Sequence, residues 1–180
     1  MEDAARKMKK ERPRPVTVPL LKKMKSEGRK IVCLTCFDAP TAGIVQASGA
    51  DVLLVGDTLG MVSLGLKNTL GVELADMTRA VKACRRGAPP AFLVGDLPFM
   101  TFQVSVERTL KAAGALMKAG ASAVKLEGAG THLAAVRRLT AEGIPVMGHV
   151  GLLPQSLHAQ GGYGKQGKVP AQALRIRQDA

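Results

Sequence analysis

The sequence has no tryptophan, one tyrosine and four phenylalanines, so aromatic residues make up only 3% of its 180 residues. Nonspecific binders of single-stranded nucleic acid stack bases on aromatic side chains, and such platforms are scarce here. Long apolar runs are also missing, because no stretch approaches the ~18 residues that a membrane-spanning helix needs. The N-terminus lacks the apolar core of a signal peptide. These absences predict a cytoplasmic protein without a membrane span, and they disfavour nucleic acid as its ligand.

Cysteine is scarce as well, and three residues fit a reducing compartment better than a disulfide framework. Cys33 and Cys36 form a C-x-x-C pair, but the pair lies within IVCLTC, a predicted strand. Side chains three apart in a strand point to opposite faces, so these two thiols cannot share one metal. No second pair of Cys or His at ligand spacing completes a zinc site. We interpret both cysteines as small apolar residues.

Acidic residues are outnumbered, and 26 Lys and Arg against 14 Asp and Glu give a formal charge of +12. The excess is uneven: residues 1–30 carry eleven basic and four acidic residues, whereas residues 31–159 carry eleven and nine. A basic tail can contact RNA or acidic surfaces by releasing counterions. A solvated leader segment without a binding partner is the commoner explanation of such a basic excess. We predict a disordered basic leader at residues 1–16 and a partial barrel domain at residues 17–180.

What the sequence does contain is a regular alternation of helices and short apolar strands. The patterns predict helices over residues 17–28, 39–48, 73–86, 105–120 and 132–142, and strands over residues 31–36, 52–56, 91–95, 122–128 and 145–151. Continuously apolar strands are typical of parallel sheets covered by helices. Repeated strand–helix–strand units predict right-handed crossovers. Both a doubly wound open sheet and a barrel satisfy these rules.

Polar residues at the strand ends separate the two architectures. Asp38, Asp57, Asp96, Glu127 and His149 stand at or just after the carboxyl ends of successive strands. A (β/α)8 barrel gathers its site from several such ends, whereas a doubly wound sheet often carries a glycine-rich turn after its first strand, and FDAPTAG has none. A closed barrel takes about 250 residues. The pattern therefore favours the (β/α)8 TIM barrel family, with this chain covering about the first five β/α units.

Two strands end in Val-Gly-Asp, which places Asp57 and Asp96 on one rim. Two carboxylates at close range are unfavourable unless a cation or a shared proton compensates them. Each could instead cap a helix, but the repeat and Glu127 together favour a hard cation, Mg2+ first. Lys125 shares a strand face with Glu127 and could hold an anionic substrate. His149 could either contact a ligand or be a hydrogen-bonded histidine of the core, and the sequence favours neither interpretation.

The segment GYGKQGK near the C-terminus has the spacing of a phosphate-binding loop. Val169 replaces the Ser or Thr that would hold Mg2+, and no predicted strand precedes the segment. We therefore exclude a nucleotide site there.

Six segments in order resemble ketopantoate hydroxymethyltransferases: LTCFDAPTA, VLLVGDTLGM, RRGAPPAFLVGDLPFM, AVKLEG, IPVMGHVGLLPQS and GGYGKQGK. They span residues 17 to about 170. The resemblance implies a (β/α)8 barrel, Mg2+ as cofactor and methylenetetrahydrofolate as cosubstrate. It implies transfer of a hydroxymethyl group to 3-methyl-2-oxobutanoate, which gives 2-dehydropantoate in pantothenate biosynthesis, and it implies a homo-oligomer for the full-length family.

The resemblance also implies roles for individual residues. Asp57 and Asp96 match the family's metal-binding carboxylates, and Glu127 its third, more distant metal partner. The substrate contacts would be Asp57, Thr58, Asp96, Lys125 and His149. The family's general base is a glutamate that would follow Ala180, so we expect the chain to be a fragment that is inactive by itself.

Two other functions stay open. One is a different Mg2+-dependent oxo-acid enzyme of the phosphoenolpyruvate mutase and isocitrate lyase type, which shares rim carboxylates but is not expected to carry GGYGKQGK or VGDTLGM. The other is a non-catalytic binding protein that uses the basic first 30 residues. Salt-dependent RNA affinity before and after deletion of these residues would decide it.

Overall fold

The computed structural model describes residues 15–128 and 130–180. The predicted leader at residues 1–16 lies outside this part of the chain, apart from Pro15 and Val16. Five strands form one parallel sheet in the order β1-β2-β3-β4-β5, which is also their order along the chain. The strands are β1 (Cys33–Thr35), β2 (Val52–Val55), β3 (Phe92–Asp96), β4 (Ala123–Glu127) and β5 (Val146–His149). Sequential order is the pattern of a (β/α) barrel wall rather than of a doubly wound sheet, which has a switch point.

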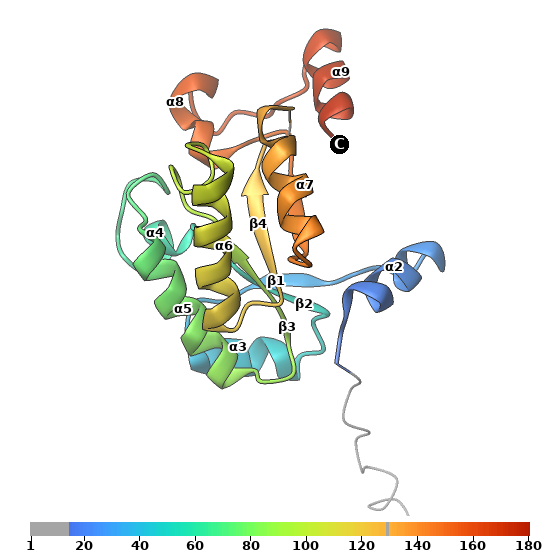
Figure 1. Cartoon of the computed structure of the whole chain (residues 1–180), viewed down its shortest axis with the longest axis vertical. Coiled ribbons are helices and arrows are strands. Elements are labelled where there is room, and N and C mark those ends of the chain that lie inside the picture. The colour runs from blue at the N-terminus through green and yellow to red at the C-terminus, as the bar shows by residue number, and fades with distance from the viewer. Residues whose placement is uncertain (1–14, 129) are drawn as a thin grey trace, which may run out of the picture.

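Helices connect the strands and cover one face of the sheet (Figure 1). The five predicted helices are confirmed as α2 (Val18–Ser26), α3 (Ala39–Ala47), α5 (Leu74–Gly87), α6 (Val106–Ala119) and α7 (Leu133–Ala141). The structure adds α4 (Leu59–Val62), α8 (Leu157–Gln160), α9 (Pro170–Asp179) and the 3-10 turns η1 (Gly130–His132) and η2 (Pro154–Ser156). The helix α6 begins as expected, because Ser105 Oγ accepts from Arg108 N at 3.2 Å.

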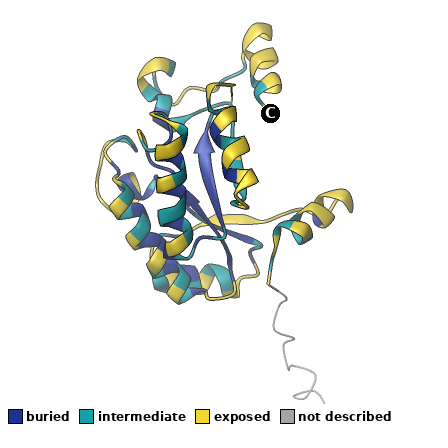
Figure 2. Cartoon of the chain, in the orientation of Figure 1, coloured by how far each residue is buried: buried dark blue, intermediate teal, exposed yellow. Residues whose placement is uncertain are grey.

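The two faces of the sheet have different partners. Leu53, Leu93 and Val124 face the helices and lie in the main core with Met77 and Leu116. Alternate residues face the opposite side, which we call the inner face. Its apolar part consists of Val52, Phe92, Val94 and Ala123, against which Val18 and Leu21 of α2 pack. Figure 2 shows the strand β4 buried behind the exposed outer surfaces of α6 and α7.

The first strand departs from the expectation of a covered parallel strand. All three residues of β1 are exposed, and Leu34 keeps 44% of its surface accessible. The strand lies at an edge of the sheet and pairs only with β2 within the described residues. Cys33 is therefore exposed, and the prediction of a buried apolar role holds only for Cys36.

Candidate functional site

Along the inner face, apolar residues give way to charged ones toward the carboxyl ends of the strands. Asp96 follows Phe92 and Val94 on β3 at intervals of two residues, and Lys125 and Glu127 follow Ala123 on β4 in the same way. Because side chains alternate along a strand, all three polar groups leave the sheet on the inner face. Their side chains are almost fully buried. The rim predicted from the sequence is therefore present at the top of this face.

The centre of the rim is an ion pair between adjacent strands. Lys125 Nζ donates to Asp96 Oδ2 at 2.6 Å, and the two residues are 9% and 1% exposed. The second oxygen, Asp96 Oδ1, is buried and has no hydrogen-bond partner among the described residues. Asp96 therefore offers one carboxylate oxygen for a further ligand.

Asp57 approaches the same carboxylate from β2. Its backbone N–H donates to Asp96 Oδ2 at 3.4 Å. Val55 pairs with Gly95 across the two strands, so the first Gly-Asp lies one residue further along than the second. Asp96 ends β3 on the inner face, whereas Asp57 lies two residues beyond the end of β2. The two aspartates thus reach one site from different levels.

A residue that the sequence analysis missed joins the carboxylates. Gln155, in η2, donates from Nε2 to Asp57 Oδ2 at 2.8 Å and to the carbonyl of Leu97 at 2.9 Å. Its backbone N–H donates to Glu127 Oε2 at 2.9 Å. Gln155 is 98 residues from Asp57 in the chain. A glutamine on its own belongs to no sequence motif for metal binding or catalysis, so the sequence analysis did not select it. The only sequence signal was a polar residue shortly after the fifth strand, in GLLPQS.

Glu127 and His149 form the outer part of the site. They are register partners on β4 and β5, and His149 Nδ1 lies 3.3 Å from Glu127 Oε1 without the geometry of a hydrogen bond. The histidine side chain is 31% exposed, which fits a group that lines the site better than one in the core. Of the two interpretations left open for His149, a ligand contact or a core histidine, its exposure and its place beside Glu127 favour the ligand contact.

Two further polar residues near the strand ends, Asp38 and Thr58, differ in their relation to the site. Asp38 caps α3, because its Oδ1 accepts from Thr41 N at 2.7 Å and its Oδ2 from Thr41 Oγ1 at 3.0 Å. Thr58 precedes α4 and is half-buried, and its Oγ1 lies 3.1 Å from where a side-chain Cβ would stand at Gly56. Thr58 is therefore next to the site, whereas Asp38 belongs to a helix terminus.

Burial dominates the electrostatics of the two aspartates. It raises the pKa of Asp96 to about 7; Lys125 opposes the shift and Asp57 adds to it. Burial also raises the pKa of Asp57, while the hydrogen bond from Gln155 and the charge of Lys125 hold it down. Desolvated carboxylates of this kind gain much from a cation or a shared proton.

The side chains of the rim are of the type that binds a divalent cation, but the three predicted ligands do not all lie together. Carboxylate oxygens are the ligands that Mg2+ prefers, and Asp96 Oδ1 is buried without a partner in this structure. Within residues 15–128 and 130–180, no three His, Cys, Asp or Glu side chains are grouped closely enough to hold a metal. The structure therefore brings Asp57 and Asp96 together but leaves Glu127 with Gln155 and His149.

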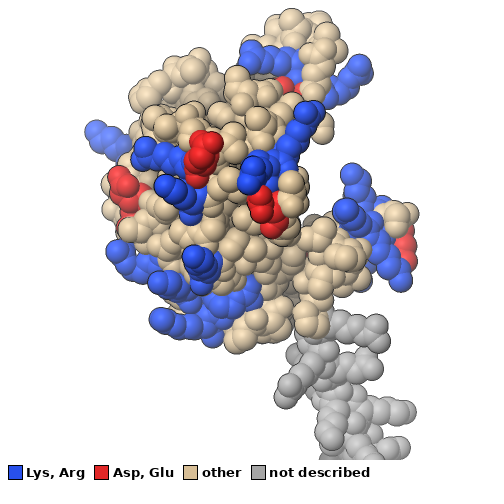
Figure 3. Space-filling view, in the orientation of Figure 1, with Lys and Arg blue, Asp and Glu red and all other residues tan. Residues whose placement is uncertain are grey.

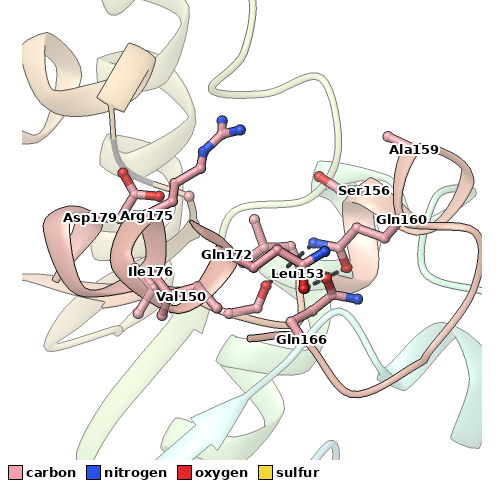
Figure 4. Close-up of a pocket in the computed structure, with 12 residues that line it drawn as sticks. Val150, Leu153, Ser156, Ala159, Gln160, Gln166, Gln172, Arg175, Ile176 and Asp179 are labelled. Atoms are coloured by element: carbon pink, nitrogen blue, oxygen red, sulfur yellow. Dashed lines mark hydrogen bonds between the residues drawn. The ribbon is translucent and has the colours of Figure 1, made fainter. Parts of the chain in front are cut away.

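Two adjoining cavities of about 360 and 370 Å³ lie beside the loop after β5 and α9, and the second also borders the loops after β3 and β4. The first is shown in Figure 4, where Gln160 accepts from Leu153 N at 3.2 Å and donates to the Gly151 carbonyl at 3.3 Å. The second reaches Glu127 and Gln155. A ligand in the second cavity would therefore contact the outer part of the site.

Comparison with known proteins gives a match over nearly the whole chain. A family model described as ketopantoate hydroxymethyltransferase matches residues 15–180. The 3-methyl-2-oxobutanoate hydroxymethyltransferase of Methylobacterium sp. (strain 4-46) is 49% identical over 164 residues, which are 91% of this chain and 57% of that protein. The enzyme of that name from Syntrophus aciditrophicus (strain SB) is 48% identical over 168 residues, 93% of this chain and 62% of that protein. The chain thus spans less than two thirds of the length of these curated relatives.

Solved structures with low sequence identity share the fold. A phosphonopyruvate hydrolase in complex with oxalate and Mg2+ superimposes with a TM-score of 0.63 at 14% identity, covering 88% of this chain and 66% of that one. A 2,3-dimethylmalate lyase of the phosphoenolpyruvate mutase and isocitrate lyase superfamily gives a TM-score of 0.58 at 17% identity, covering 87% and 55%. These likenesses confirm the predicted barrel-type fold.

Proposed function

The chain belongs to the ketopantoate hydroxymethyltransferase family, and we propose that it carries the metal and substrate side of a site that transfers a hydroxymethyl group to 3-methyl-2-oxobutanoate. The product would be 2-dehydropantoate. The observation that carries the proposal is the meeting of Asp57, Asp96 and Lys125 in one buried cluster at the carboxyl ends of β2, β3 and β4. The one-carbon donor we assign is methylenetetrahydrofolate, with the cavity that reaches Glu127 as its approach.

Each residue has a distinct task in this proposal. Asp57 and Asp96 would hold Mg2+, with Glu127 as a more distant partner, and the ion would supply Lewis-acid stabilisation of negative charge on the oxygens of the oxo acid. Lys125 would attract the substrate carboxylate, since its ammonium is already desolvated beside Asp96. Thr58 and His149 would contact the substrate from the two sides of the rim. We assign the removal of the C3 proton to none of the described residues.

Calorimetry with the full 180-residue chain tests the proposal. We expect 3-methyl-2-oxobutanoate to bind only when Mg2+ is present, and we expect Asp57→Asn and Asp96→Asn each to abolish that binding. Asp38→Asn is the matched control, because it makes the same chemical change at a strand-end aspartate that caps a helix, and asparagine also caps helices. Metal-independent binding, or a folded chain that binds no oxo acid, would contradict the proposal.

The same titration separates the alternative enzyme class. Phosphonopyruvate and oxalate serve as competing ligands, because a solved relative in fold is a phosphonopyruvate hydrolase with bound oxalate. Preference for these ligands over 3-methyl-2-oxobutanoate would favour the phosphoenolpyruvate mutase and isocitrate lyase type.

The described surface gives the third function no added support. Figure 3 shows Lys and Arg side chains spread over the helical face with Asp and Glu among them. No helix in the described residues is long and apolar enough to cross a membrane. Binding of RNA or acidic surfaces through the basic first 30 residues stays a prediction, which the salt dependence of RNA affinity before and after their deletion would test.

A further inference from the structure

We propose that Gln103 and Gln155 form an amide relay that positions Asp57 for the divalent cation, while the backbone N–H of Gln155 holds Glu127, so that Gln155 is a positioning residue of the site. The inference rests on the proposed function, because it concerns the same carboxylates. Gln155 is 6% exposed and, through three hydrogen bonds, links Asp57 and Leu97, which follow β2 and β3, to Glu127 at the end of β4. Gln103 holds its amide from the other side at 3.0 Å.

The backbone fixes which end of each amide donates. The N–H of Phe102 donates to Gln103 Oε1 at 3.4 Å, which leaves Gln103 Nε2 as the donor to Gln155 Oε1. At the far end, the carbonyl of Leu97 can only accept, so Gln155 must present Nε2 there. Both ends therefore require the same orientation of the Gln155 amide. In that orientation its second N–H is directed to Asp57 Oδ2.

This arrangement gives the buried carboxylates donors without giving them a second cation. Gln155 uses both Nε2 hydrogens and its Oε1, so its amide is fully satisfied although it is buried. The neutral side-chain amide fixes the rotation of Asp57, and the backbone N–H of the same residue donates to Glu127 Oε2. Neither donor carries a charge, so the negative charge of both carboxylates stays available. A lysine at this place would compete with a metal ion, whereas an apolar side chain would leave Asp57 Oδ2 without its donor and keep only the backbone hydrogen bond to Glu127.

Gln103→Glu tests the relay without touching either carboxylate. Glutamate has the shape of glutamine but cannot donate when ionised, so the Gln155 amide loses the partner that orients it. We expect the Kd for Mg2+, measured by calorimetry on the full chain without substrate, to rise about tenfold or more. Simple electrostatics predicts the opposite sign, because an added negative charge near the site attracts a cation. Gln178→Glu on the exposed surface of α9 is the matched control and should leave the Kd unchanged.

A second variant and a folding measurement separate the outcomes. Gln155→Leu should also weaken Mg2+ binding about tenfold or more, and circular dichroism with thermal unfolding checks that each variant is folded. If the wild-type chain binds Mg2+ and the folded variants bind it equally well, the relay is refuted and the proposed function stands. If the folded wild-type chain binds no Mg2+, the metal site of the proposed function fails and this inference fails with it.

Discussion

Lys125 donates to Asp96 across 2.6 Å, and the two residues are also register partners on β4 and β3. Register partners in parallel strands leave the sheet on the same face, so the backbone pairing itself brings these side chains together. The ammonium is thereby fixed beside the carboxylate of Asp96 on the neighbouring strand, and two strands away from β2, which Asp57 follows.

Lys125→Met should leave Asp96 buried without its ionic partner. At a pH well above the pKa of about 7 of Asp96, breaking a buried pair by removing one partner costs about 3 kcal/mol of unfolding free energy, because the remaining charge is uncompensated. Urea unfolding measures the loss, and it should be smaller at low pH, where Asp96 can take up a proton. Lys118→Met, at an exposed position of α6, should stay within about 0.5 kcal/mol of the wild type. Equal losses in the two variants would count against the buried pair.

The raised pKa of Asp96 predicts a stability that falls as pH rises. The folded carboxyl titrates near 7 against an ordinary value of 3.8, so the folded chain binds more protons than the unfolded chain between these values. The free energy of unfolding therefore decreases with pH across that window. Asp96→Asn removes this contribution. Urea unfolding in a chelator at about pH 5 and about pH 7.5 should show a steeper decline in the wild type than in the variant. Parallel declines would mean that Asp96 is ionised throughout.

The sequence predicted the rim but could not predict how its members divide their tasks. Both copies of Val-Gly-Asp follow buried strands, which placed Asp57 and Asp96 together. The one-residue stagger between them depends on the pairing of Val55 with Gly95, which no single segment encodes. Asp38 follows a strand in the same way, yet Thr41 makes it a helix cap.

Gln155 was beyond sequence reasoning for a related reason. Its role arises only after the loop that follows β5 folds back over the ends of three other strands. The core was easier to predict, because continuous apolar runs such as residues 52–55 and 92–94 identify buried strands directly. Long-range polar contacts leave no such period in the sequence.

Gly87→Ala and Gly114→Ala should change stability in opposite directions. A Cβ at Gly87, the last residue of α5, would stand too close to the carbonyl oxygen of Ala39 at the start of α3. The two helices would have to separate, and overpacking of this kind costs about 3 kcal/mol. Gly114 lies within α6, and a methyl group added there would meet nothing within 4 Å apart from its chain neighbours and the backbone of its own helix, so alanine should stabilise the helix by about 1 kcal/mol. Thermal unfolding of both variants measures the two changes in stability. Destabilisation by Gly114→Ala would contradict the predicted opposite signs.

Arg85 ties together the amino ends of the two strands that carry the ion pair. Its guanidinium extends from α5 and donates to four backbone carbonyls and one hydroxyl, those of Gly120, Ala88, Pro89, Ala91 and Ser122. The acceptors lie just before β3 and β4, whose far ends bear Asp96 and Lys125. Lysine cannot reproduce this fork of donors, so Arg85→Lys leaves several acceptors unsatisfied.

We expect Arg85→Lys to lower the free energy of unfolding by about 2 kcal/mol, since each hydrogen bond contributes roughly 1 kcal/mol and lysine retains some of them. Arg86→Lys makes the same change at the next residue, which is exposed, and should alter stability by less than about 0.5 kcal/mol. Urea unfolding compares the two variants, and Mg2+ calorimetry on the folded chains shows whether the effect reaches the rim. Because Arg85 contacts only the amino ends of β3 and β4, its loss should reduce stability without changing the Kd for Mg2+. A higher Kd for Mg2+ in the fully folded variant would instead mean that a shift at the amino ends of the strands moves the residues at their carboxyl ends.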